Sequence, residues 1–375
     1  MKDRAVLALA DGRCFWGRAF GKRGETSGEI VFNTSMSGYQ EILTDPSYAG
    51  QIVTLTTPHV GVCGVNPGDD ETEKVFAQGL VVRQASWRPS SWRSQMPLDT
   101  WLKENEVVAV TDIDTRAVTR AIRDEGAQGA CILSDHPDPD AAVARARAVP
   151  PMAGRALAEE VSTRKAYAWE EPPQPLEDWT EVPSMQGGLV AVLDFGVKRA
   201  SLRFLRGLGA KVLVMPARSE AREILSLSPR GVFLSNGPGD PEPLDFAQET
   251  IRALADARVP MLGICLGHQL LALALGASTR KMKFGHHGAN HPVLDLGTKK
   301  VYITSQNHGF CVEEKSLPEG LLASHRSLFD HTLQGVRHLR LPLLGVQGHP
   351  EACPGPRDGR GVFLEFSCLM EGFRA

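Results

Sequence analysis

Cys265 stands at the centre of residues 263–267, Gly-Ile-Cys-Leu-Gly, with a glycine two positions away on either side. This is the spacing of a nucleophile elbow, in which a sharp strand-to-helix turn exposes the central side chain. The glycines leave space in a turn that is too tight for neighbouring side chains. A helix that begins at Cys265 also places its positive end beside the sulfur, which favours the thiolate. We therefore predict a nucleophile here, although a lone cysteine is more often a small buried hydrophobic residue.

A nucleophile also needs a base, and His349 and Glu351 follow a short apolar segment late in the chain. Side chains two residues apart in an extended chain project on the same side. The Glu351 carboxylate could therefore hold one ring nitrogen of His349 while the other nitrogen serves Cys265. A single histidine in a loop is more often structural, but the pairing with a carboxylate favours a triad of Cys265, His349 and Glu351.

An oxyanion site is the third requirement, and residues 236–241, Asn-Gly-Pro-Gly-Asp-Pro, follow a predicted buried strand. By itself this sequence is typical of an ordinary strand-to-helix turn. In an active site, backbone N–H groups of the turn would face the reacting carbonyl. They would act together with the N–H of Leu266, the residue after the nucleophile.

The elements that must position these residues alternate between strand and helix from residue 189 onward. Continuous apolar runs of this kind are typical of strands buried on both faces of a parallel sheet. The predicted strands are 189–195, 211–215, 231–235 and 259–263, and the predicted helices end near 208, 225 and 258. The pattern predicts an α/β domain with a mainly parallel sheet flanked by helices, and the site at the carboxyl ends of the strands.

The amino-terminal part is richer in strand signals and predicts a small α+β domain. Asp11-Gly12 between two apolar runs indicates a hairpin, and residues 114–125 read as a helix ended by Gly126. Proline and glycine accumulate between 169 and 188, which indicates a connecting segment without regular structure. We therefore predict domains at 1–150 and 188–375, joined by residues 151–187.

Composition restricts the classes of function. The chain has 375 residues, of which 42% are hydrophobic and 23% charged, with a formal net charge of -3. This balance gives no reason to expect nucleic acid or a membrane as a partner, and no apolar run approaches the roughly 20 residues of a membrane span. The seven cysteines form no C-x-x-C pair, which favours a reducing, cytoplasmic location over a disulfide framework or a cysteine-rich zinc site.

The elbow followed by His-Gln, the Gly-Pro-Gly turn and the His-Pro-Glu of residues 349–351 together resemble class I glutamine amidotransferase domains. Residues 32–48 and 112–116 resemble the amino-terminal domain of carbamoyl-phosphate synthetase small subunits. The resemblance covers essentially the whole chain and implies the triad Cys265, His349 and Glu351. It also implies a set of contacts to L-glutamine: Ser47, Gly237, Gly239, Leu266, Gln269, Asn307, Gly309 and Phe310. Lys198 is a weaker candidate, and Ser47 on its own reads as a turn hydroxyl after Asp45-Pro46.

The resemblance further implies a glutaminase subunit that forms a thioester at Cys265 and delivers ammonia to a large synthetase subunit. That subunit would make carbamoyl phosphate from bicarbonate and ATP for arginine biosynthesis, pyrimidine biosynthesis or both. ATP and Mg²⁺ are expected on the large subunit and no cofactor on this chain, which shows no phosphate-binding loop. Two alternatives stay open: an independent class I amidotransferase or glutaminase, and a non-catalytic regulatory subunit, for which a broken triad would be expected.

Residues 281–291 contain three histidines, His286, His287 and His291. Their spacing fits no common zinc pattern and no acidic ligand is close by. We expect no metal, and interpret this stretch as a loop that borders the site or a partner surface.

Overall fold

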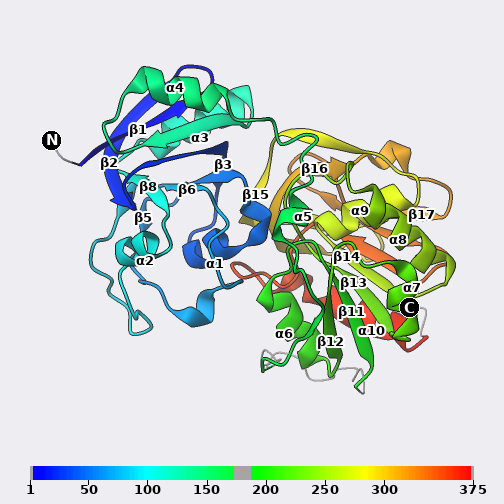
Figure 1. Ribbon diagram of the computed structural model, residues 1–375. Helices are drawn as coiled ribbons and strands as arrows, with labels where there is room; N and C mark the ends of the chain where they lie inside the picture. The colour runs from blue at the N-terminus through cyan, green and yellow to red at the C-terminus, as the bar shows by residue number, and fades with distance from the viewer. Residues whose placement is uncertain (1–2, 173–186, 373–375) are drawn as a thin grey trace. The chain divides into compact units, whose positions relative to one another are not determined.

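The computed structural model describes residues 3–172 and 187–372. The chain divides into two compact units, one of residues 1–153 with 283–289 and the other of residues 154–282 with 290–375 (Figure 1). Part of the predicted connecting segment, residues 173–186, lies outside the described residues. The described part of that segment contains helix α5 (Leu157–Val161) and strand β10 (Tyr167–Ala168), both within the second unit.

Seven described strands of the first unit close into a barrel, in the order β1-β2-β8-β6-β4-β3-β9. The predicted hairpin at Asp11-Gly12 is confirmed, because the two strands that flank it pair antiparallel with Ala8 opposite Cys14. Closure of the barrel was not predicted, since it joins segments that lie far apart in sequence. The strands are β1 (Arg4–Leu9), β2 (Cys14–Gly21), β3 (Glu25–Asn33), β4 (Gln51–Leu55), β6 (Gly79–Val81), β8 (Val108–Thr111) and β9 (Gln128–Leu133).

Helix α3 (Thr115–Glu125) confirms the helix expected at 114–125. The Asp114 side chain accepts a hydrogen bond from Ala117 N at 3.1 Å, which satisfies one of the free N–H groups of the first turn. Its buried face, including Val118 and Ile122, packs in the same hydrophobic cluster as barrel strands. The α+β character of this unit is therefore as predicted.

The second unit is built on a ten-stranded sheet, in the order β10-β12-β11-β13-β14-β19-β18-β17-β15-β16. The parallel arrangement is confirmed for five adjacent strands: β12 (Lys211–Pro216), β11 (Leu189–Asp194), β13 (Gly231–Leu234), β14 (Met261–Ile264) and β19 (Leu343–Val346). Beyond β19 the sheet continues antiparallel, which the alternating strand-helix pattern did not indicate. The added strands are β18 (Leu333–His338), β17 (Leu321–Ser327) and β15 (Thr279–Asp295), with β16 (Val301–Val312) at the edge.

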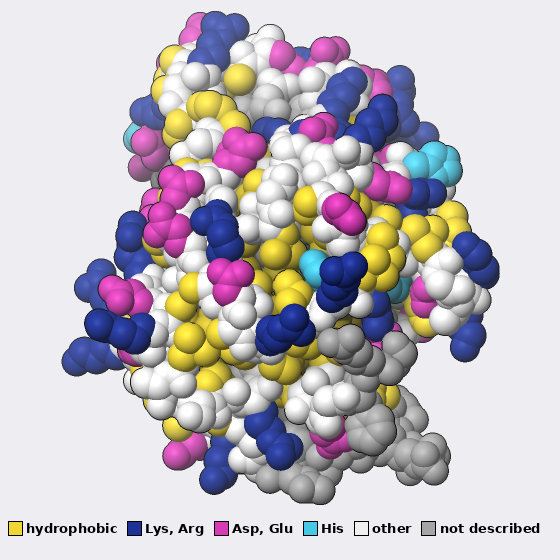
Figure 2. Space-filling view, turned by 90° about the vertical axis from the view of Figure 1, so that its right-hand side faces the viewer, with side chains coloured by type: hydrophobic (Ala, Val, Ile, Leu, Met, Phe, Trp, Pro, Cys, Tyr) yellow, Lys and Arg dark blue, Asp and Glu magenta, His cyan; other side chains and the backbone are white. Residues whose placement is uncertain are grey.

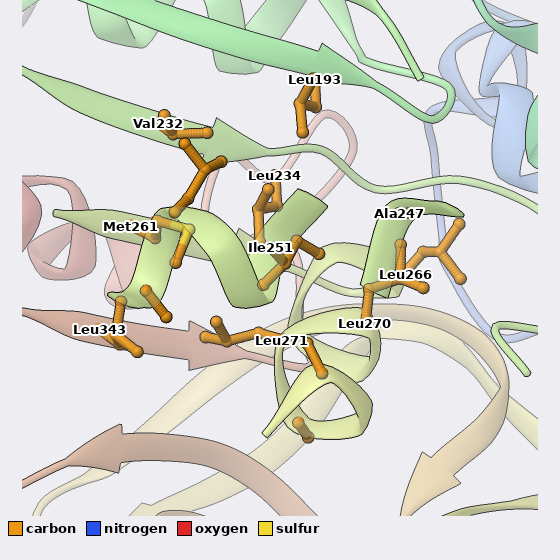
Figure 3. Packing of buried hydrophobic residues seen from close by; sticks show 14 of the residues in the cluster. Leu193, Val232, Leu234, Ala247, Ile251, Met261, Leu266, Leu270, Leu271 and Leu343 are labelled. Carbon is orange, nitrogen blue, oxygen red and sulfur yellow. The ribbon is translucent and has the colours of Figure 1, made fainter. Parts of the chain in front are cut away.

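Helices cover both faces of this sheet (Figure 1). One face carries α7 (Ala221–Ser226), α8 (Asp245–Asp256) and α9 (Leu266–Ala274), and the other carries α6 (Arg199–Gly207) and α10 (Gly361–Met370). Figure 3 shows Leu266 and Leu270 of α9 among apolar side chains of α8 and the strands. Each fully buried leucine stabilises the fold by about 1.5–3 kcal/mol, so the helix after the nucleophile is firmly held.

The histidine-rich stretch 281–291 is not a loop, as we had expected, but part of the 17-residue strand β15. Within this strand Gly285 and Gly288 have φ values of 70° and 159°. Residues 283–289 belong to the first unit, where Thr34 N donates to His287 O at 3.2 Å. Among the described residues, no cluster of three or more histidine, cysteine or acidic side chains has the arrangement of a metal site.

Surface charge follows the balanced composition. On the face shown in Figure 2, basic and acidic side chains are interspersed among apolar and uncharged ones. Within the described part of the chain, no helix has the length and apolar character needed to cross a membrane.

Candidate active site

The predicted elbow is present as a local structure. β14 ends at Ile264, α9 begins at Leu266, and Cys265 between them has φ 53° and ψ −105°. A residue with a side chain seldom combines a positive φ with such a ψ, and backbone strain of this kind clusters at functional sites. The Cys265 N–H donates to Val346 O at 2.9 Å, which fixes the elbow to strand β19.

The two glycines of the elbow are required by backbone contacts on both sides. A Cβ atom on Gly267 would lie 2.1 Å from Leu234 O, and one on Gly263 would lie 2.5 Å from Gly267 O. Neither distance is compatible with a side chain. The spacing that pointed to Cys265 in the sequence therefore reflects close packing between the elbow, the start of α9 and strand β13.

His349 and Glu351 form the expected contact, with 2.7 Å between His349 Nδ1 and Glu351 Oε1. Both side chains are buried, at 3% and 0% exposure. The geometry differs from the extended chain that we assumed, because Ala352 N donates to His349 O at 3.0 Å and closes a turn. His349 N also donates to Ser305 O at 2.8 Å, so β16 holds the residue in place.

The charges of this pair are linked. Burial alone would lower the pKa of His349, but the Glu351 carboxylate and the Cys265 thiol outweigh burial and raise it to about 10. Burial would raise the pKa of Glu351, yet His349 and Lys198 together lower it. An imidazolium and a carboxylate therefore face each other at neutral pH, and a protonated His349 can give a proton to a leaving group.

The backbone brings Cys265 near the segment of His349, because Cys265 N donates to Val346 O three residues before it, and the Cys265 side chain contributes to the raised pKa of His349. The Cys265 thiol donates to Asn307 O at 3.5 Å. The structure thus brings Asn307, one of the residues expected to contact glutamine, to the nucleophile.

Lys198, the weaker candidate, lies against the acidic member of the triad. Its ammonium donates to Ala352 O and Cys353 O, both at 2.8 Å, and lies 3.5 Å from Glu351 Oε1. The side chain is buried, with 2% exposure. Lys198 therefore fixes the turn that carries Glu351 and contributes a positive charge to it.

The Gly-Pro-Gly turn packs against the elbow. A Cβ atom on Gly237 would lie 2.0 Å from Phe195 O and 2.9 Å from a methyl carbon of Leu266, while Gly239 has φ 87°. Leu266 is the first residue of α9, so its N–H has no partner four residues earlier in the helix. This arrangement can supply backbone donors to an oxyanion. Gly309 lies two residues after Asn307, and a Cβ atom added to it would have no atom within 4 Å.

Gln269 and Phe310 also meet, because Gln269 Nε2 donates to Phe310 O at 2.9 Å. The same nitrogen donates to Gln347 Oε1 at 3.0 Å. Sequence reasoning missed Gln347. The only signal available was a polar residue at the end of an apolar strand, two positions before His349.

Ser47, the expected contact from the amino-terminal part, lies in the first unit on the short 3-10 helix η1 (Pro46–Tyr48). Asp45 caps this turn by accepting from Ser47 N at 2.9 Å. Ser47 is buried, with 7% exposure. The turn predicted from Asp45-Pro46 is therefore present, and the role of the hydroxyl stays a prediction.

Comparison with known proteins identifies two regions. Residues 7–132 match the family described as carbamoyl-phosphate synthase small chain, CPSase domain, and residues 191–368 match glutamine amidotransferase class-I. A carbamoyl phosphate synthase small chain from Thioalkalivibrio sulfidiphilus is 54% identical over 368 residues, covering 98% of this chain and 97% of the relative. The small chain from Pectobacterium atrosepticum is 50% identical, covering 100% of this chain and 99% of the relative. The small chain from Syntrophotalea carbinolica is 51% identical, covering 98% of this chain and 98% of the relative.

Proposed function

Because the chain belongs to the carbamoyl phosphate synthase small chain family, we propose that it is the glutamine-hydrolysing subunit of that enzyme. It releases ammonia from L-glutamine for a larger synthetase subunit. The observation that carries this proposal is the buried His349–Glu351 pair beside the Cys265 elbow. These side chains have the chemistry that acyl transfer through a thioester requires.

In the first half of the reaction, the proton of Cys265 lies on His349, and the Cys265 thiolate attacks the side-chain amide carbon of glutamine. The oxygen becomes an oxyanion that backbone N–H groups at Leu266 and the Gly-Pro-Gly turn stabilise. When the C–N bond breaks, protonated His349 gives its proton to the leaving nitrogen and ammonia departs. The acyl group remains on Cys265 as a thioester.

In the second half, neutral His349 takes a proton from water as the water oxygen attacks the thioester carbon. The C–S bond breaks, glutamate is released, and Cys265 and His349 again share the one proton with which the cycle began. Glu351 holds the ring through its 2.7 Å contact in both halves and stabilises the imidazolium whenever it forms. Lys198 keeps the Glu351 turn in place.

Ammonia then passes to the larger subunit, on which we place the chemistry of ATP, Mg²⁺ and bicarbonate that yields carbamoyl phosphate. A cytoplasmic location belongs to the same proposal. The match of residues 7–132 to the small chain family supports this assignment over an independent glutaminase, and the filled triad positions support it over a non-catalytic regulatory subunit.

Co-purification of the tagged full chain from its own host tests the proposal. We expect a large subunit to accompany it, and the complex to make carbamoyl phosphate from glutamine, bicarbonate and ATP while it releases glutamate. Glutamate release without carbamoyl phosphate by any complex would show an independent glutaminase. A complex that makes carbamoyl phosphate from ammonia but never from glutamine would show a regulatory subunit.

A further inference from the structure

The side-chain amide of Gln269 has only one possible orientation. Phe310 O is a backbone carbonyl and can only accept, so the group that faces it at 2.9 Å must be the Gln269 NH₂. The second N–H of that group points to Gln347 Oε1 at 3.0 Å. Both donors of the amide are therefore used inside the protein, and Gln269 Oε1 has no donor among the described residues.

Gln347 is the residue that completes this arrangement. Its side chain is fully buried, at 0% exposure, and its backbone N–H donates to Gln334 O of β18 at 2.9 Å. Because Gln269 presents a donor, Gln347 must face it with its oxygen. The Gln347 Nε2 atom is buried and has no acceptor within the described part of the chain, so the contact to Gln269 is the only hydrogen bond of this side chain.

The contact joins the two segments that carry the catalytic groups. Gln269 lies in the first turn of α9, where its N–H donates to Cys265 O at 3.1 Å. Gln347 follows β19 and stands two residues before His349. The pair therefore links the helix of the nucleophile to the loop of the base through a single hydrogen bond.

We infer that Gln347 is a positioning residue for substrate binding, which acts by holding the Gln269 amide so that only its oxygen can face glutamine. This inference rests on the proposed function. A group that only accepts selects an N–H donor of the substrate, and loss of Gln347 leaves one Gln269 N–H unpaired and its side chain less constrained. Gln347 does not touch the reacting atoms, so binding should suffer more than turnover.

The test is Gln347→Met in the full chain, because methionine has a similar volume and no acceptor of comparable strength. We expect KM for glutamine to rise about three- to tenfold, the effect of one neutral hydrogen bond, with kcat changed less than about twofold. The glutamine concentration that half-protects Cys265 from iodoacetamide should rise by the same factor. The labelling rate without glutamine should stay the same, which shows that the site is folded.

Three comparisons separate positioning from a general loosening of the core. Gln334→Met removes another buried glutamine side chain that does not contact Gln269, with 2% exposure, and should leave KM unchanged. In a Gln269→Met background, Gln347→Met should have no further effect on KM, since the residue acts through Gln269. Gln347→Glu keeps an acceptor and loses no donor contact, so its KM should stay close to that of the wild type even if its melting temperature falls.

An unchanged KM for glutamine in Gln347→Met would overturn the inference. So would a rise in KM that Gln347→Met causes equally in the wild-type and in the Gln269→Met background. If Gln347→Met fails to fold, Gln347→Asn replaces it, because asparagine is too short to reach Gln269 and should give the same rise. Wild-type protein that neither hydrolyses glutamine nor is protected by it would instead refute the proposed function.

Discussion

Lys198 Nζ lies 3.5 Å from Glu351 Oε1, and both side chains are buried. The ammonium also donates to the backbone carbonyls of Ala352 and Cys353, the two residues that follow Glu351. His349 Nδ1 contacts the same carboxylate oxygen at 2.7 Å. Glu351 therefore interacts with two positive charges, and the residue that orients the catalytic imidazole is itself held by a lysine that lies far earlier in the chain, just before α6.

Lys198→Met should destabilise the protein by about 2–5 kcal/mol, because it removes a buried charge partner of Glu351 and two hydrogen bonds to the backbone of the turn that follows it. Urea unfolding at neutral pH measures this loss. The exposed Lys300→Met serves as the control and should be within about 0.5 kcal/mol of the wild type. Equal stability of the two variants would show that Lys198 is not needed to hold the turn.

Cys265→Ser should abolish glutamine-dependent synthesis of carbamoyl phosphate by the complex, while synthesis from added ammonia persists. A serine hydroxyl is a much poorer nucleophile than a thiolate at neutral pH. Peptide mapping after brief iodoacetamide treatment should find Cys265 labelled ahead of the other six cysteines, with glutamine protecting it. Full glutaminase activity in the serine variant would rule out Cys265 as the nucleophile.

His349→Asn should reduce kcat for glutamine hydrolysis more than Glu351→Gln does. His349 transfers the proton itself, whereas Glu351 orients the ring and stabilises its charge. Steady-state glutamate release by the two variants decides the order. Equal or inverted losses would contradict these roles.

The same pair predicts how stability depends on pH. The pKa of His349 is raised from 6.5 to about 10. Its contribution to the free energy of unfolding should therefore be complete below pH 6.5 and should be lost as pH rises toward 10. Glu351 has a lowered pKa, and its contribution should be lost as pH falls below its ordinary value of 4.5. Unfolding of wild type and His349→Asn across this range should show a difference that shrinks on the alkaline side. A difference that grows there would reverse the sign of our assignment.

Ser47→Ala tests the contact that the family resemblance implies for the amino-terminal unit. If the hydroxyl hydrogen-bonds to glutamine, KM for glutamine should rise about five- to a hundredfold, since the lost bond is worth about 1–3 kcal/mol. Ammonia-dependent synthesis should not change. Ser134→Ala, another buried serine of the same unit, is the control. An unaltered KM would leave Ser47 as a turn residue.

The local features of this protein could be predicted from its amino-acid sequence. The elbow could be predicted because close backbone approach at Gly263 and Gly267 excludes side chains, and this requirement appears directly as glycine spacing. The His349–Glu351 contact is also local, since the two residues are two positions apart in the chain. The strand and helix order from residue 189 followed from apolar runs and helical periodicity, which depend only on neighbouring residues.

The distant residues that support those local features could not be predicted, because they are brought together by the folding of the whole chain. Lys198 and Gln347 have ordinary surroundings in the sequence, and their roles arise because α6 and β19 bring them to Glu351 and Gln269. Closure of the barrel and the assignment of residues 283–289 to the first unit also depend on contacts across long stretches of chain. Such contacts form because buried polar groups and strand edges must find partners, and the partner can come from any part of the fold. Hydrophobic periodicity and residue spacing do not indicate which distant residue becomes the partner.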